Sequence, residues 1–173
     1  VDLLKFKQTI TQEQIREAEN AWRAYTSSSL EELNQFIDEC YALPFLKQAY
    51  IAHKGYLPSE KNGLNEVEFL VLSMLNDGIC IFAELFNKVS KQQINDGLSD
   101  LYFAALLNEL MKGDYPLISC NGQLSNYKHQ NPQAEIVCTK WGLDVIKGKA
   151  NRIELIGIDW WVGGIHLLEK AIK

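Results

Sequence analysis

Apolar residues recur at helical spacing through the first part of the chain. Thr11 and Gln14 are three positions apart, as in a capping box, so a helix is predicted over residues 11–25. The apolar face predicted for this helix consists of Ile15, Ala18, Trp22 and Tyr25. The first helix is therefore expected to be amphipathic.

Two more helices are predicted in the same region. Ser29 and Glu32 have the spacing of a second capping box, and Pro44 has the position of a residue in the first turn of a third helix, which Gly55 ends. The apolar positions of the second helix are Leu33, Phe36, Ile37, Cys40 and Tyr41. Residues 1–56 are thus predicted to form an N-terminal helical unit.

A stretch rich in turn residues, 55–63, separates this unit from the rest of the chain. Asn65 then has the position of a helix cap. The nearly continuous apolar run Ile79–Phe86 is compatible with a short helix or a strand, and a helix is preferred. Ser99 begins a third helix over residues 99–112. The buried stripe predicted for it consists of Phe103, Leu106, Leu107, Leu110 and Met111.

The pattern then changes from helical to extended. Two short β-rich runs, Tyr115–Cys120 and Glu135–Cys138, flank a polar loop over residues 121–134. A short helix is predicted over residues 140–147 and a strand over Arg152–Ile156. The remaining tail is expected to end in helix.

Three helices followed by a two-stranded ribbon is the element order of a winged helix-turn-helix. The predicted fold class is mainly α with a small β ribbon (α+β). In this prediction the N-terminal helical unit is followed by a winged-helix-like domain over residues 57–173. The helix 99–112 would take the recognition position and residues 121–134 the wing. The order of elements carries this prediction, since no diagnostic motif accompanies it.

The composition is that of a globular protein with a hydrophobic core: of the 173 residues, 47% are hydrophobic and 23% are charged. It excludes a disordered segment, a fibrous repeat and a disulfide miniprotein. The net charge of −5 argues against broad binding to nucleic acid or anionic membranes. Arginine, which most often reads guanine, is absent from residues 60–150. The side chains that could still contact DNA are Asn108, Lys112 and Lys128, so nucleic acid is a possible but disfavoured partner.

No pattern points to a metal or a cofactor, and none is expected. The cysteines form no CxxC pair, and the phosphate-binding, nucleophile-elbow and zinc-protease motifs are absent from the sequence. The cysteines are Cys40, Cys80, Cys120 and Cys138. No run reaches the roughly 18 apolar residues that a membrane-spanning helix needs, so no membrane partner and a cytoplasmic location are expected.

The closing segment holds most of the candidate functional residues. Asp159 and His166 could form a general-base pair, and the Gly163–Gly164 N–H groups could hold an anion. Alternatively, the glycines let the tail turn closely against the core and His166 makes one structural hydrogen bond; the lack of a nucleophile motif favours this interpretation. Trp160 and Trp161 would point to opposite faces of an extended segment, one to the core and one to a neighbour or partner.

Arg152 is a further candidate in this region. It is the only arginine after Arg23. It could pair with Asp159 or Glu154 and so fix the predicted strand, and this structural interpretation is preferred to a role in binding.

Several stretches together resemble a known family: "WRAY", "LPFL", "LPSEKNGLNEVE", "LISCNG", "EIVCTKWGLDVIKGK" and "GIDWWVGGIHL". They are similar to the C-terminal part of an uncharacterised bacterial family, domain of unknown function 1835, usually paired with domain of unknown function 3658. The resemblance implies a further N-terminal domain, so the chain is expected to be a C-terminal fragment. It implies no activity. The positions that it marks are Arg152, Gly157, Asp159, Trp161, Gly163, Gly164 and His166.

The chain departs from the family pattern at two positions. Asn65 replaces the usual Ser or Thr cap, which is chemically equivalent. Trp160 stands where a basic residue is expected, which weakens the idea of an anion site there.

These observations favour a non-catalytic regulatory or protein-interaction module. Its partner is expected to be a protein, either the N-terminal domain of its own chain or another chain. The candidate docking groups are Trp22, Tyr25, Trp160 and Trp161. Two other classes remain open: a DNA-binding regulator that uses the helix 99–112, and a small-ligand or enzymatic site near Asp159 and His166.

Overall fold

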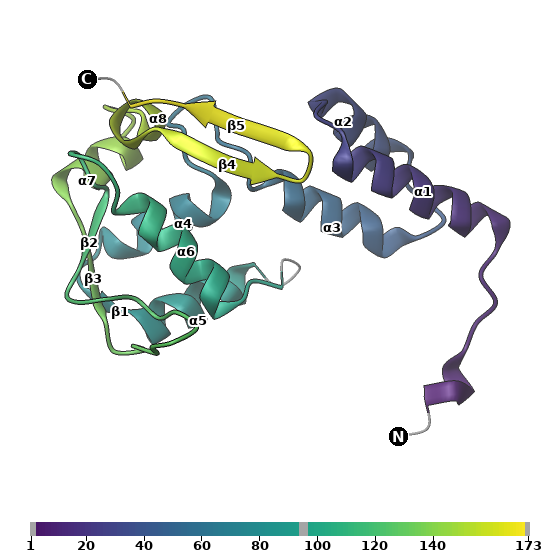
Figure 1. Ribbon diagram of the computed structural model, residues 1–173, viewed down its shortest axis with the longest axis horizontal. Helices are drawn as coiled ribbons and strands as arrows, with labels where there is room; N and C mark the ends of the chain where they lie inside the picture. The colour runs from purple at the N-terminus through teal and green to yellow at the C-terminus, as the bar shows by residue number, and fades with distance from the viewer. Residues whose placement is uncertain (1–2, 94–96, 172–173) are drawn as a thin grey trace.

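The computed structural model describes residues 3–93 and 97–171. Within these ranges helices predominate, and the strands form one three-stranded and one two-stranded antiparallel sheet (Figure 1). The predicted fold class, mainly α with a small β component, is confirmed.

The N-terminal unit has its own apolar cluster. Its elements are the 3-10 helix η1 (Leu3–Phe6), α1 (Gln12–Thr26), α2 (Leu30–Glu39) and α3 (Pro44–Lys54). The three α-helices enclose the buried residues Ala21, Ala24, Leu33, Phe36, Cys40 and Tyr50. The Thr11–Gln14 capping box is present as predicted. At α2 the Ser29 side chain accepts from the Glu32 N–H, so the predicted box is present only as its Ser29 cap. The helix η1 extends away from the body (Figure 1).

The buried face of α1 differs from the predicted one. Its buried residues are Glu17, Ala21 and Ala24, whereas Trp22 is 67% exposed. Two alanines let α1 approach its neighbours closely, and the buried Glu17 carboxylate accepts hydrogen bonds from the backbone N–H groups of residues 41–43. Close packing and a satisfied carboxylate thus decide which face is buried, and the more hydrophobic stripe is left outside.

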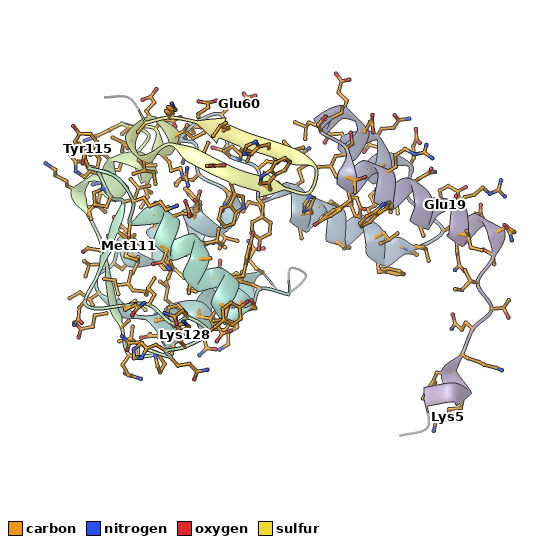
Figure 2. All side chains as sticks on the ribbon, in the orientation of Figure 1. Lys5, Glu19, Glu60, Met111, Tyr115 and Lys128 are labelled. Carbon is orange, nitrogen blue, oxygen red and sulfur yellow. The ribbon has the colours of Figure 1, made fainter. Side chains whose placement is uncertain are left out.

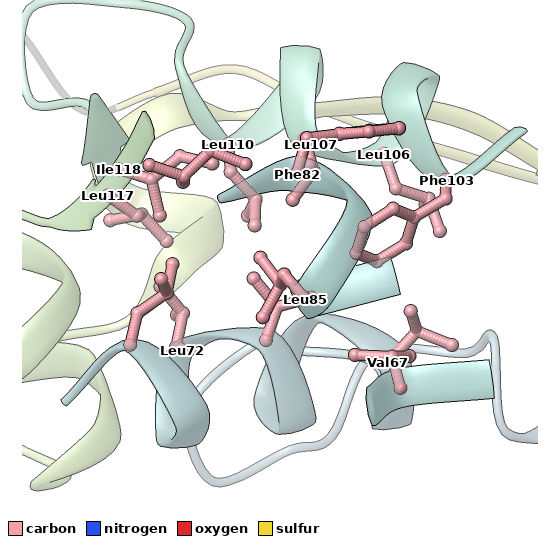
Figure 3. Packing of buried hydrophobic residues seen from close by; sticks show 14 of the residues in the cluster. Val67, Leu72, Phe82, Leu85, Phe103, Leu106, Leu107, Leu110, Leu117 and Ile118 are labelled. Carbon is pink, nitrogen blue, oxygen red and sulfur yellow. The ribbon is translucent and has the colours of Figure 1, made fainter. Parts of the chain in front are cut away.

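The second body contains the larger core. Its helices are α4 (Glu66–Leu75), α5 (Phe82–Gln92), α6 (Asp100–Leu110), α7 (Lys140–Ile146) and α8 (Arg152–Ile156). Its strands are β1 (Cys80–Ile81), β2 (Ile118–Cys120), β3 (Glu135–Cys138), β4 (Ile158–Val162) and β5 (Ile165–Glu169). Side chains from α4, α5, α6 and the β2 region interdigitate in this core (Figure 3).

The predicted helix over Ile79–Phe86 is wrong at its start. Cys80 and Ile81 form β1, which pairs with Ile136 and Glu135 of β3, and α5 begins only at Phe82. β2 pairs with the other edge of β3, so the sheet order is β1-β3-β2. A strand therefore lies between α4 and α5, where the continuous apolar run concealed it.

The predictions for the C-terminal region are also corrected. Arg152–Ile156, predicted as a strand, is α8, because Asn151 caps it and Gly157 ends it. The tail, predicted to end in helix, forms the β4–β5 hairpin, with Val162 opposite Ile165. Its last two residues lie outside the described ranges. Two glycines between short runs of β-branched and aromatic residues are the sequence signal for this hairpin.

Candidate functional site

The turn of the β4–β5 hairpin is pressed against the end of α1. The N–H of Gly164 donates to the carbonyl oxygen of Tyr25 at 2.8 Å. A Cβ atom at Gly164 would overlap the main chain of Thr26, and Gly163 has a φ of +59°, so both positions require glycine. The close approach expected for this glycine pair is confirmed, and it joins the hairpin to the N-terminal unit.

The two adjacent tryptophans point to opposite faces of the hairpin. Trp160 packs against the larger core, with its ring 5.9 Å from that of Tyr102 in α6. Trp161 is 62% exposed, and its ring is stacked on that of His166 at 4.3 Å with an interplanar angle of 1°. Trp160 thus packs against the core and Trp161 lies on the surface, in the opposite orientations that the sequence predicted.

A groove of about 420 Å³ opens between the hairpin, the N-terminal unit and the start of α6. Aromatic side chains dominate its lining, with the Tyr25 ring 5.0 Å from that of His53 and the Tyr56 ring 5.6 Å from that of Tyr102. The lining residues are Tyr25, His53, Tyr56, Gly97, Leu98, Ser99, Tyr102, Trp161, Val162 and Gly163. We call this the aromatic groove. No Lys, Arg, Asp or Glu is among these lining residues.

The aromatic groove brings together some of the predicted residues and adds others. Tyr25 and Trp161 both line it, and Trp22 is stacked on Tyr25 with ring centroids 6.0 Å apart. Sequence reasoning did not identify His53, Tyr56 or Tyr102 as site residues. They lie in segments far apart along the chain, and no local motif connects them.

The predicted Asp159–His166 pair forms, but on the outer face of the hairpin. The Asp159 Oδ1 and His166 Nε2 atoms are 2.9 Å apart, and the Asp159 side chain is 75% exposed. Water therefore has free access to the pair, whereas an acid–base site usually excludes water. The Gly164 N–H is already used by Tyr25, so it cannot help to hold an anion. The geometry favours the structural interpretation of the pair.

Arg152 has different partners from those predicted. Its guanidinium is buried, lies 3.2 Å from Glu68 Oε1, and donates to the Gly157 carbonyl oxygen. Burial raises the pKa of the Glu68 carboxyl, and the Arg152 charge opposes that shift. Asp159 and Glu154 do not pair with Arg152. The arginine therefore fixes the start of the hairpin to α4 and takes no part in the groove.

The side chains predicted for DNA contact are dispersed or already paired. The Asn108 side chain donates to the Ala104 carbonyl oxygen at 2.9 Å, and Lys112 Nζ lies 2.6 Å from Glu109 Oε1. Lys128 lies in the loop between β2 and β3, at the edge of the body away from the hairpin (Figure 2). The structure does not gather these three residues into one positive surface.

The cysteines and the possibility of a metal site or a membrane span are considered next. All four cysteines are free thiols, and burial raises the pKa of Cys40 and of Cys138 to about 11. Within residues 3–93 and 97–171, no group of three or more His, Cys, Asp or Glu side chains has the arrangement of a metal site. In the same ranges, the helices are too short or too polar to cross a membrane.

Comparison with known proteins gave no match, whether with family models, with curated proteins or with solved structures. The resemblance to domain of unknown function 1835, paired with domain of unknown function 3658, therefore stays a prediction.

Proposed function

We propose that this chain is a non-catalytic protein-interaction module that binds an extended, proline-containing segment of a partner protein in the aromatic groove. The observation that carries the proposal is the lining of the groove. Aromatic residues of α1, of the end of α3 and the loop after it, of α6 and of the hairpin line it, and none of the described residues in this lining is Lys, Arg, Asp or Glu.

The chemistry of this lining selects the kind of segment. Proline-rich chains already adopt the extended polyproline II helix before they bind. Their proline rings pack on aromatic side chains, and their carbonyl groups have no internal hydrogen bonds. Trp161, which is 62% exposed, offers both a ring surface and an indole N–H donor. The described lining residues include no lysine or arginine to attract phosphate, which favours a neutral peptide over a nucleic acid.

The fold proposed for the second body is winged-helix-like. Its support is the order α4-β1-α5-α6-β2-β3 together with the sheet order β1-β3-β2. In that arrangement α6 takes the recognition position and the loop between β2 and β3 takes that of the wing. Because Trp160 of the hairpin packs against Tyr102, one side of α6 is already covered. This supports a winged-helix scaffold that binds protein in preference to DNA.

The test is selection of peptides from a random display library on the purified chain, followed by titration of the selected peptides. The proposal predicts enrichment of proline-containing neutral sequences. Trp161→Ala should weaken their binding by about tenfold or more, because a central aromatic anchor commonly contributes most of the affinity of a small interface.

The control is Tyr127→Ala, since Tyr127 is an aromatic residue that is 92% exposed on the loop between β2 and β3. This variant should bind as the unmodified chain does. Equal binding by the Trp161→Ala and Tyr127→Ala variants would refute the proposal.

Duplex DNA of mixed sequence provides the second arm of the test. Salt-sensitive binding that Lys112→Glu and Lys128→Glu abolish would replace the proposal with a DNA-binding function. Peptides derived from other domains of the full-length chain would distinguish an internal partner from a separate protein.

A further inference from the structure

Two buried side-chain N–H donors of the larger body have no hydrogen-bond partner among the described residues. They are the indole Nε1 of Trp160 in β4 and the Nε of Arg152 in α8. The other two nitrogens of the arginine are used, because Nη2 lies 3.2 Å from Glu68 Oε1 and Nη1 donates to the Gly157 carbonyl oxygen. Arg152 is only 3% exposed, so bulk solvent does not reach its Nε–H. Buried donors without a partner are rare in folded proteins, because they lower stability.

Both donors belong to residues that line the same small cavity. The cavity has a volume of about 10 Å³, which is close to the smallest space that holds one water molecule. Its lining also contains the carboxylates of Glu68 in α4 and Glu109 in α6. Tyr56 and Asn65 add further polar groups to the lining. The cavity thus lies where α4, α6, α8 and the start of the hairpin meet.

The two carboxylates can accept further hydrogen bonds in this cavity. Glu68 Oε1 is paired with Arg152, and Glu68 Oε2 accepts from the Asn65 N–H at 3.0 Å. Each carboxylate oxygen has two lone pairs, so each can accept once more. Glu109 Oε1 lies 2.6 Å from Lys112 Nζ, which leaves Oε2 of this carboxylate as an acceptor. The lining therefore offers two N–H donors and two carboxylates with acceptor sites to spare.

We propose that this cavity is the binding site of one structural water molecule. The water accepts hydrogen bonds from Trp160 Nε1–H and Arg152 Nε–H, and it donates its two hydrogens to the carboxylates of Glu68 and Glu109. Water has two acceptor and two donor sites, which match these four groups. An anion would meet two carboxylates at this position, and a cation would meet a guanidinium and two N–H donors.

The water joins four elements of the larger body. Its two donors come from β4 and α8, and its two acceptors come from α4 and α6. The ring of Trp160 also lies 5.9 Å from that of Tyr102, which lines the aromatic groove. The water therefore fixes β4 against α6 beside the groove. This role does not depend on peptide binding in the groove, so the two proposals can fail separately.

The test is a crystal structure of the full chain at a resolution that shows ordered water. One solvent peak should lie within about 3.2 Å of both Trp160 Nε1 and Arg152 Nε. A second crystal, soaked in sodium bromide, tests for an anion at the same position, because bromide is located by its anomalous scattering. No bromide is expected there.

A double-mutant cycle tests the water in solution. Trp160→Phe removes the N–H donor and keeps an aromatic ring, and Glu109→Leu removes an acceptor. Because both changes remove a partner of the same water, the second should matter less once the first has been made. The equilibrium constant for folding of the double variant, measured with urea, should be about twofold to tenfold larger than the product of the single effects predicts.

Glu84→Leu is the matched control for Glu109→Leu. It also breaks an ion pair between a helical glutamate and a lysine, since Glu84 Oε1 lies 2.7 Å from Lys88 Nζ, but Glu84 does not line the cavity. Its effect should simply multiply with that of Trp160→Phe. The proposal would be overturned by a cavity without a water that contacts both donors, by bromide in its place, or by a Trp160→Phe, Glu109→Leu pair that behaves as the control pair does.

Discussion

Replacement of Glu17 by Gln should destabilise the N-terminal unit in a pH-dependent manner. The two carboxylate oxygens of Glu17 accept hydrogen bonds from the N–H groups of Tyr41, Ala42 and Leu43 at 3.0, 2.7 and 2.6 Å. They also accept one from the Cys40 thiol at 3.1 Å. A glutamine amide would turn one acceptor into a donor that faces other donors.

The magnitude follows from the carboxyl pKa. Burial acts to raise the pKa of Glu17, and the hydrogen bonds from Tyr41, Ala42, Cys40 and Leu43 outweigh it, so that the pKa falls from its ordinary value of 4.5 to about 2. A lowered acid pKa stabilises the fold above the unfolded-state value, and this stabilisation is lost as the pH falls through the folded-state value. The difference corresponds to about 3 kcal/mol at neutral pH, lost between about pH 4.5 and pH 2.

Urea unfolding at pH 7 and at steps down to pH 2 measures this contribution, and hydrogen exchange of the α1–α3 amides assigns it to the N-terminal unit. The stability gap between the unmodified chain and Glu17→Gln should be about 3 kcal/mol at pH 7 and should shrink toward pH 2. Glu60→Gln, at an exposed carboxylate in a loop, is the control and should show no gap. A gap that does not vary with pH would refute the argument.

Three further changes test the fold around the site, each by urea unfolding. Asn65→Ala removes the capping box of α4 and should cost about 1–2 kcal/mol; an unchanged midpoint would contradict this role for Asn65. Gly164→Ala should lower the free energy of unfolding by about 2 kcal/mol, because the new Cβ cannot fit beside the Thr26 main chain. It should also increase the quenching of tryptophan fluorescence by an added quencher. If neither quantity changes, the turn is not held against α1. Arg152→Met should lower the free energy of unfolding by about 3–5 kcal/mol, because it leaves the Glu68 carboxylate buried without its partner. Adding Glu68→Leu to the same chain should recover part of this stability. If the effects of the two changes simply add, the pairing is contradicted.

Local signals predicted the helices well and the C-terminal hairpin poorly. Caps such as Thr11, Ser29 and Asn65 act over three or four residues, so a sequence window contains all the atoms involved. The run Arg152–Ile156 is too short for its periodicity to distinguish strand from helix. There the flanking residues determine that the run is a helix: Asn151 caps its start and Gly157 ends it.

The choice of the buried face of α1 shows a different limit. Hydrophobicity favours the stripe that contains Trp22, whereas the fold buries Ala21, Ala24 and Glu17. The carboxylate becomes compatible with burial only when the turn before α3 brings its N–H groups to it. That partner lies more than twenty residues away, so it is invisible to a pattern confined to one helix.

The candidate site was predictable only in part for the same reason. Trp161 and the glycine pair could be singled out from the closing segment alone. The remainder of the aromatic groove depends on where the hairpin packs against α1 and α6, because Tyr25, His53 and Tyr102 reach it from separate helices. Tertiary packing creates this surface, and no spacing in the sequence encodes it.

The most direct test of the proposed function is titration of the ¹⁵N-labelled chain with a blocked oligoproline peptide, followed by NMR. We predict that the shifts concentrate on Trp161, Tyr102 and the hairpin turn, that Trp161→Ala weakens the binding by about tenfold or more, and that Tyr127→Ala does not. Shifts spread over the loop between β2 and β3, or no saturable shifts at the aromatic groove, would contradict the claim that this groove binds a proline-containing segment of a protein.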